Sequence, residues 1–148
     1  MSCCRLVARC CVPLALSACI AGIVPAAEPL ETVPASEMPP IAGSGWFCFD
    51  YAVVAGNRSF QHSRCARTRE ECDEEASGVR TGRTVEGVTD VGFCQPDSEA
   101  ACYYVWNNES DGRHRCFRTL RECQGRVDAR RDAAGSPGAR QSECIILK

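Results

Sequence analysis

The sequence lacks the features that mark several large functional classes. Of its 148 residues only two are histidine, and 17 Lys and Arg stand against 19 Asp and Glu, which gives a formal net charge of −2. A general nucleic-acid binder is usually strongly basic, so this balance predicts no nucleic-acid partner. The longest apolar run, Cys10 to Val24, is about 15 residues long. A membrane-spanning helix needs roughly 18 to 20, so none is expected.

Cysteine is the residue in excess. Thirteen are present; five lie in the first nineteen residues and eight lie between Cys48 and Cys144. An even set of eight predicts a closed disulfide framework, which persists only in oxidising compartments. The body contains no Cys-x-x-Cys pair, whereas structural zinc sites favour cysteines two to four residues apart. We therefore expect disulfides, with no metal and no cofactor.

Residues 1–27 have the pattern of a secretory signal peptide. Arg5 and Arg9 precede the apolar run, and small residues around Ala26 and Ala27 provide a cleavage site. A second route uses Leu16-Ser17-Ala18-Cys19, which resembles a bacterial lipobox in which Cys19 is lipidated. Ordinary cleavage is preferred because the apolar stretch continues past Cys19. Either route predicts an exported protein that is periplasmic, outer-membrane-anchored or extracellular and meets a membrane only through that lipid.

Residues 28–45 are rich in proline and glutamate and show no apolar periodicity. Such a segment buries too little apolar surface to offset its ordering entropy. The sequence predicts an extended, disordered linker here.

The body divides into two similar halves, residues 46–98 and 99–148. Their cysteines are separated by 16, 6 and 21 residues in the first half and by 13, 6 and 20 in the second. The central octets, CARTREEC and CFRTLREC, are identical at five of eight positions. This agreement indicates a tandem repeat. The eight repeat cysteines are Cys48, Cys65, Cys72, Cys94, Cys102, Cys116, Cys123 and Cys144.

Each octet also predicts the start of a helix. Thr68 with Glu71, and Thr119 with Glu122, match the capping box, in which threonine and glutamate side chains each bond a backbone amide of the other residue. Each helix then carries its cysteine, Cys72 or Cys123, in the first turn.

Aromatic and β-branched segments predict strands before the octets and around the fourth cysteines. The fold class expected is small disulfide-rich α+β, with two tandem β-β-α-β modules, each holding two disulfides. By alternation, Phe47, Phe49, Tyr51 and Val53 share one face of the first strand and form core. Tyr104 and Trp106 share the other face with Cys102, either exposed or packed between the modules.

Four cysteines per module allow three pairings, and sequence alone does not choose among them. We prefer the pairing that ties the helix to the sheet. It joins Cys48 to Cys72 and Cys65 to Cys94, and likewise Cys102 to Cys123 and Cys116 to Cys144.

The CxRTxxEC octet inside a doubled four-cysteine unit resembles tandem-repeat proteins that are predicted to be exported by myxobacteria and related bacteria. The resemblance covers residues 46–148. It implies export and the repeat architecture, and it brings no activity or ligand with it.

A binding or structural role at the cell surface or envelope is the function expected, with a protein or surface polymer as partner and a monomeric chain. Tyr104, Trp106, Arg80 and Arg83 are the candidate binding surface. The alternative is a small secreted protease inhibitor or effector, in which Arg80 or Arg83 anchors a trypsin-like protease.

An enzyme is not expected, because neither histidine occupies an equivalent position in the two halves and no catalytic constellation is present. Hydrolysis by a carboxylate pair stays the least favoured alternative.

The halves differ in charge, net −3 for residues 46–98 and +2 for residues 99–148. This difference allows either separate partners or mutual attraction.

Overall fold

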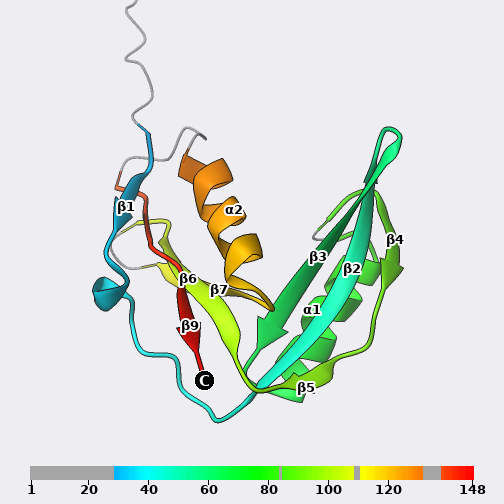
Figure 1. Cartoon of the computed structure of the whole chain (residues 1–148), viewed down its shortest axis with the longest axis horizontal. Coiled ribbons are helices and arrows are strands. Elements are labelled where there is room, and N and C mark those ends of the chain that lie inside the picture. Colours follow the sequence, from blue (N-terminus) through cyan, green and yellow to red (C-terminus); the bar gives the residue numbers. More distant parts are fainter. Residues whose placement is uncertain (1–28, 84, 109–110, 132–137) are drawn as a thin grey trace, which may run out of the picture.

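The computed structural model describes residues 29–83, 85–108, 111–131 and 138–148. Its strands form two sheets, and one helix packs against each (Figure 1). The protein is therefore small α+β with four disulfides. The predicted signal peptide, its cleavage positions and Cys19 lie outside the described residues. No helix in the described ranges is long and apolar enough to cross a membrane.

The first half of the body, residues 46–98, builds the first sheet around an antiparallel hairpin. Two further short strands pair antiparallel with the first strand of that hairpin. Gly56, with a φ of 60°, turns the hairpin in the left-handed region that glycine tolerates. The elements are β2 (Trp46–Ala55), β3 (Arg58–Ala66), α1 (Arg69–Arg80), β4 (Val88–Val91) and β5 (Gln95–Asp97).

The second half, residues 99–148, builds the second sheet in the same order of elements. This sheet gains one strand from the N-terminal side of the chain, β1 (Glu31–Val33), which pairs parallel with β8. The elements are β6 (Ala100–Trp106), β7 (Gly112–Phe117), α2 (Leu120–Arg131), β8 (Arg140–Ser142) and β9 (Ile145–Leu147).

The last strand of each half differs from the prediction of one continuous strand carrying the fourth cysteine. Cys94 lies between β4 and β5, and Cys144 lies between β8 and β9. In both halves the final strand gains one extra residue across that break. Tyr51 faces Val91 and Cys48 faces Gln95, so three steps along β2 correspond to four steps along its partner. The extra residue acts as a bulge, which redirects a side chain, and here it lets the cysteine reach the helix.

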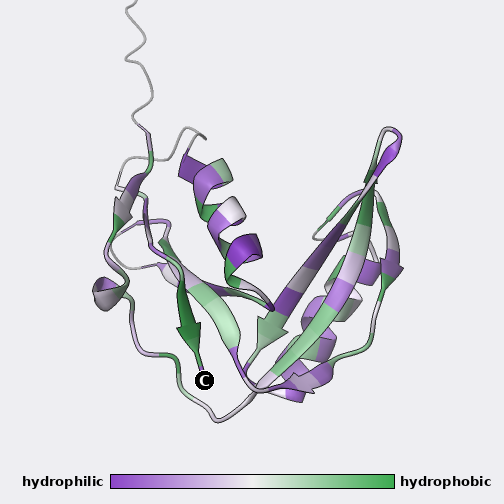
Figure 2. Ribbon diagram, in the orientation of Figure 1, coloured by the Kyte–Doolittle hydropathy of each residue, from purple (hydrophilic) through white to green (hydrophobic). Residues whose placement is uncertain are grey.

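Alternation along the first strand of each half separates two cores. Phe49 and Tyr51 are buried against α1, with Phe47 and Val53 packed beside them, as predicted. On β6, Tyr103 and Val105 are buried against α2 in the same way. Hydrophilic residues cover much of both helices, whereas β6 and β9 are largely hydrophobic (Figure 2).

The preferred disulfide pairing is wrong. The structure joins Cys48 to Cys65 and Cys102 to Cys116 across the hairpins, and joins each helix cysteine to the fourth cysteine, Cys72–Cys94 and Cys123–Cys144. Alternation gives the reason. Because Phe49 faces α1, its neighbour Cys48 faces away from the helix and cannot reach Cys72.

Cys48 instead lies directly opposite Cys65 in the hairpin, with a Cα–Cα distance of 4.1 Å. Such close spacing is typical of a non-hydrogen-bonded antiparallel pair. The predicted disulfide between helix and sheet is present, but the fourth cysteine of each half provides it instead of the first.

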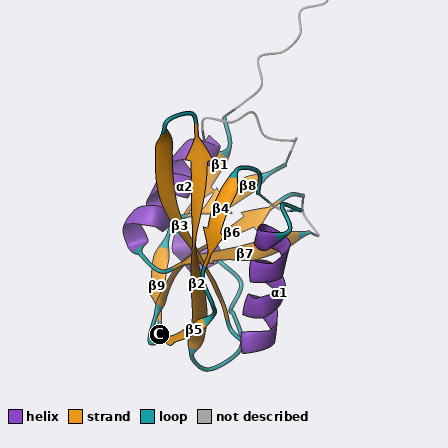
Figure 3. Cartoon of the chain, turned by 90° about the vertical axis from the view of Figure 1, so that its right-hand side faces the viewer, coloured by secondary structure: helices purple, strands orange, loops and turns teal. Residues whose placement is uncertain are grey.

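The two hairpin disulfides pack against each other and join the halves. Cys48, Cys65, Cys102 and Cys116 form one buried cluster with Trp46 and Ala100. Trp46 is 1% exposed, and its Nε1 donates a hydrogen bond to the carbonyl oxygen of Leu147 at 3.0 Å. The sheets meet at this cluster and diverge from it (Figure 1), and α1 and α2 lie on opposite sides of the crossed strands (Figure 3).

One of the two hydrogen bonds of each predicted capping box is present. Thr68 Oγ1 accepts a hydrogen bond from the Glu71 amide at 3.1 Å, and Thr119 Oγ1 accepts from the Glu122 amide at 3.2 Å. The return bond is replaced in the second half. The Glu122 carboxylate accepts from Ser63 of the first half, from the backbone N–H at 2.7 Å and from the hydroxyl at 2.6 Å.

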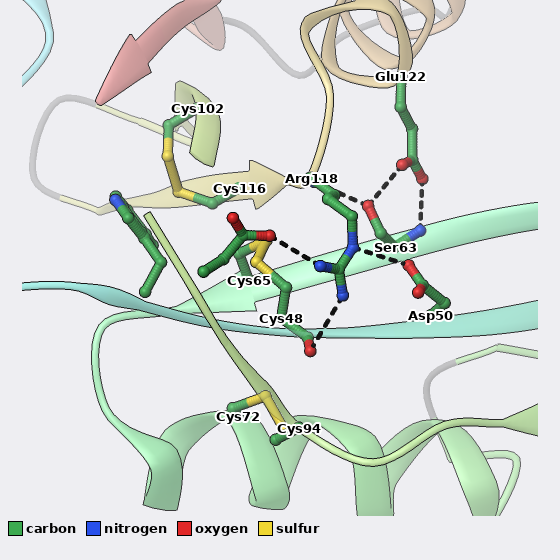
Figure 4. Close-up of a disulfide and its surroundings, with 12 residues drawn as sticks. Cys48, Asp50, Ser63, Cys65, Cys72, Cys94, Cys102, Cys116, Arg118 and Glu122 are labelled. Carbon is green, nitrogen blue, oxygen red and sulfur yellow. Dashed lines mark hydrogen bonds and ion pairs between the residues drawn. A yellow bond between two sulfur atoms is a disulfide. The ribbon is translucent and has the colours of Figure 1, made fainter. Parts of the chain in front are cut away.

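Arg118 makes a further polar connection between the halves. Its guanidinium reaches Asp50 Oδ1 at 3.2 Å, Asp97 Oδ2 at 2.7 Å and the Cys48 carbonyl at 3.3 Å (Figure 4). Its backbone N–H donates to Ser63 Oγ at 2.8 Å. Arginine suits this place because its planar fork satisfies several acceptors at once.

Residues 29–38 are not the disordered linker that their composition predicts. Leu30 and Val33 are each 5% exposed, and β1 pairs with β8. A short 3-10 helix, Ala35–Glu37, follows, and Glu37 pairs with Arg140 at 3.1 Å. Two buried apolar side chains and one short strand pairing are enough to order this segment, because the edge strand of a sheet offers unpaired backbone groups for it to bind. The N-terminal segment is thus part of the second sheet.

Candidate anion-binding cleft

A cleft lies where the outer strands of the two sheets, β3 and β7, approach each other. Its smaller part, which we call the α2 pocket, has a volume of about 410 Å³ and is lined by both hairpins and by α2. Its charged and aromatic lining residues are Arg64, Arg115, Arg126, Arg130, His62, His114, Glu75, Tyr51, Tyr103 and Phe117.

The larger part, the α1 pocket, has a volume of about 800 Å³. It shares six lining residues with the α2 pocket, so the two form adjoining parts of one cleft. Arginines and glutamates are mixed here; those that the α2 pocket lacks are Arg67, Arg83, Arg113, Glu71 and Glu74. The α2 pocket is therefore the more cationic end.

The cationic excess comes from one charge reversal between the halves. Arg64 and Arg115 both precede a hairpin cysteine, and Arg64 pairs with Glu75 of α1 at 3.7 Å. Glu75 stands three residues after Cys72, and the residue three after Cys123 is Arg126. The second half thus has an arginine where the first half has the neutralising carboxylate.

Four arginines of the cleft, Arg113 in the α1 pocket and three in the α2 pocket, have no carboxylate partner in the part of the chain that the structure describes. Among the described residues, no Asp or Glu lies within ion-pair distance of Arg113, Arg115, Arg126 or Arg130. The Nε of Arg130 is also buried without a hydrogen-bond partner in the part of the chain that the structure describes. Since a buried donor normally has an acceptor, this end of the cleft presents unused donors.

Burial and neighbouring charges shift the pKa values of two groups in the cleft. Burial lowers the pKa of the Arg115 guanidinium and the charges of Arg113 and Arg64 lower it further, whereas Tyr103 and Glu75 act in the opposite direction. Burial likewise raises the pKa of the Tyr103 phenol, although the nearby charges of Arg115, Arg130, Arg126 and Arg113 act in the opposite direction. An anion in this pocket would relieve the repulsion among guanidinium groups.

His62 makes the stability of the fold depend on pH. Burial lowers the pKa of its imidazole, and the charge of Arg126 adds to the lowering, while the nearby Glu122 opposes both. The folded chain therefore binds this proton less readily than the unfolded chain. The stability due to neutral His62 is present above its ordinary value of 6.5 and is lost as pH falls through the lower, folded pKa.

We expect H62Q to reduce the acid sensitivity of the fold. Between about pH 7.5 and pH 5, urea titrations should show a smaller loss of unfolding free energy for H62Q than for the wild type, because glutamine takes up no proton. Equal losses in both proteins would show that His62 does not contribute to the pH dependence.

The structure separates the residues predicted to form a binding surface. Arg80 lies exposed in the last turn of α1, whereas Arg83 lines the α1 pocket. Trp106 is 8% exposed beneath the guanidinium of Arg140, whose centre lies 4.5 Å from the ring centroid. Tyr104 is half-buried and contacts Trp106 and His114 edge to face.

The face that holds Tyr104 and Trp106 therefore packs internally. His114 bonds the carbonyl oxygen of Pro39 at 2.8 Å, which brings the N-terminal segment to this side of the second sheet. Ala100 and Cys102 of the same face belong to the cluster between the halves.

Sequence reasoning missed the residues that matter most for the cleft. It noted the net charge of each half but singled out neither Arg115 nor Arg126. Alignment of the two halves on their cysteines would have revealed the reversal from Glu75 to Arg126. Ser63 and Arg118, which connect the halves, carry no signal in the sequence beyond the arginine that both octets share.

No cluster of three or more His, Cys, Asp or Glu suited to a metal ion occurs among the described residues. Comparison of the chain with protein families, with curated proteins and with solved structures finds no match.

Proposed function

We propose that this chain is an exported binding protein that holds an acidic ligand in the cleft between its two halves. The ligand class that fits best is an acidic polymer of the cell surface or envelope. The halves are, in this proposal, tandem β-β-α-β modules with two disulfides each, and each final strand is interrupted at its cysteine.

The observation that carries the proposal is a set of three arginines in the α2 pocket, Arg115, Arg126 and Arg130, for which the described residues provide no ion-pair partner. Keeping several guanidinium groups together without counter-charges is unfavourable, because each repels the others in a partly desolvated site. Proteins place arginine in this way where planar, bidentate recognition of carboxylate or phosphate is needed. The whole chain is slightly acidic, so we expect no general nucleic-acid binding.

Export is supported by the four disulfides, which are typical of proteins from oxidising compartments. We infer a monomer, because the cleft lies between two halves of one chain and needs no second copy. We propose binding rather than catalysis. All eight cysteines of the body are in disulfides, and the cleft is dominated by arginine.

The protease-inhibitor alternative gains no support from the residues proposed for it. A protease engages an extended segment, and Arg80 is helical. Arg83 lines the α1 pocket, and its Nε donates a hydrogen bond to Thr81 Oγ1 at 3.0 Å.

The test compares two charge reversals on the same helix. Arg126 lines the α2 pocket, whereas Arg121 is exposed and lines neither pocket. The oxidised proteins are applied to immobilised polygalacturonate, dextran sulfate and phosphomannan at fixed ionic strength. A charge-assisted hydrogen bond contributes about 1.5 to 3 kcal/mol. R126E should therefore weaken binding to at least one polymer about tenfold to hundredfold, and R121E should bind as the wild type does.

R126E is also a variant that should fold. It places a carboxylate where the first half has Glu75, and it removes a positive charge that opposes protonation of His62. Equal weakening by R121E and R126E would mean that only net charge matters, and the proposed site would be wrong. Failure of the wild type to bind any of the three polymers would refute the proposal as a whole.

A further inference from the structure

We propose that the α2 pocket receives a phosphate monoester and that the α1 pocket receives the sugar that carries it. This inference rests on the proposed function and specifies its ligand as a phosphorylated saccharide. It follows from the different chemistry of the two adjoining pockets.

The α2 pocket matches a doubly charged, tetrahedral group. Four arginines line it against one carboxylate, that of Glu75. A carboxylate ligand would bring one charge and two oxygens, whereas a phosphate monoester brings nearly two charges and three free oxygens at neutral pH. Several guanidinium forks from different elements can share three oxygens without competing for one plane.

Tyr103 and Arg130 add donors at the same place. Tyr103 is 6% exposed and lines the α2 pocket, where the charges of the surrounding arginines act on its phenol. The buried Nε of Arg130 has no acceptor among the residues that the structure describes. A phosphate oxygen would satisfy a donor that is otherwise buried at a cost.

The α1 pocket suits hydroxyl groups rather than a second anion. Glu71, Glu74 and Glu75 line it together with arginines, so a second anionic group placed there would meet carboxylates. Hydroxyl groups donate to carboxylates and accept from guanidinium groups, and a sugar ring presents several of both kinds. The Nε of Arg67, which lines this pocket, is another buried nitrogen without an acceptor in the described part of the chain.

The volumes agree with a ligand of this size. The cleft parts of about 410 and 800 Å³ fall in the range of small-molecule sites, roughly 300 to 1,000 Å³. Arg64 and Arg115 line both parts. A phosphate on one side of these arginines and a sugar on the other would bridge the two pockets.

The experiment measures binding of four probes to the full, oxidised chain by calorimetry at fixed pH and ionic strength. The probes are glucose 6-phosphate, glucuronate, inorganic phosphate and glucose. We expect glucose 6-phosphate to bind at least about tenfold more tightly than glucuronate and several-fold more tightly than inorganic phosphate, with no detectable binding of glucose. R126E should weaken glucose 6-phosphate binding about tenfold or more, and R121E should leave it within about twofold.

The outcomes separate this inference from the proposed function. Glucuronate binding that equals or exceeds glucose 6-phosphate binding, and is lost in R126E, would overturn the phosphate assignment and leave acidic-ligand binding intact. Equal affinities for inorganic phosphate and glucose 6-phosphate would overturn the sugar assignment of the α1 pocket. No binding of any acidic probe would count against both proposals.

Discussion

Replacement of Trp46 by alanine is expected to lower the free energy of unfolding by about 3 to 5 kcal/mol. The indole is 1% exposed and lies in the cluster that the two hairpin disulfides form between the halves. The guanidinium of Arg67 stacks on the ring, 3.8 Å from its centroid, and the indole N–H bonds Leu147. The substitution therefore removes a large buried ring and leaves the Leu147 carbonyl without this donor.

Guanidinium chloride titrations of the oxidised proteins measure the effect, and F93A is the control. Phe93 is 83% exposed, so its truncation should change stability by less than about 0.5 kcal/mol. A loss below about 1 kcal/mol for W46A, far short of a usual Trp-to-Ala cost, would show that the halves do not depend on this cluster.

Removal of the Cys72–Cys94 disulfide by the double substitution C72A and C94A is expected to cost about 2 to 4 kcal/mol. The bridge closes a chain segment with a sequence separation of 22 and joins α1 to the segment between β4 and β5. Both cysteines are almost fully buried, at 1% and 2% exposed. Without the bridge, α1 is held to β2 mainly by the buried side chains of Ala76 and Val79.

Hydrogen exchange localises the effect of that disulfide. Amides of α1 should exchange faster in the double variant, while those of α2 should change little, because Cys123–Cys144 is intact. The matched variant, C123A with C144A, should show the opposite pattern, since its bridge spans a similar separation of 21. Equal acceleration in both helices for either variant would mean that the halves unfold as one unit.

Mapping of non-reduced peptides from the wild type should recover the four pairings of the structure.

Much of the local structure could be predicted from the sequence because short-range rules decide it. Threonine caps begin both helices, and period-two alternation correctly predicts that Phe49 and Tyr51 share one strand face and form core. The same alternation places Cys48 on the opposite face, and the preferred pairing overlooked it. The disulfide pairing therefore follows side-chain direction along the strand, not the size of the loop that each bridge closes.

What the sequence could not show depends on contacts between segments far apart in the chain. Leu30 and Val33 are two apolar residues in a proline-rich stretch, and only a neighbouring strand edge makes them core. The cleft also depends on contacts between segments that are far apart in the chain. Arg64 and Arg115 belong to separate hairpins, and a charge count for each half cannot show that both line one pocket.

The pairing of β1 with β8 has a consequence for the order in which the chain folds. Glu31 faces Arg140, and Trp46 bonds Leu147 across 101 residues of sequence, so both contacts close very long loops. Long-range contacts form late, because the entropy of loop closure must be offset before they stabilise anything. The β2–β3 hairpin has local partners and can form early, whereas the first described residues of the chain find their partner only after the last strands exist. A chain emerging N-terminus first would thus complete the second sheet, and the cluster around Trp46, as its final step.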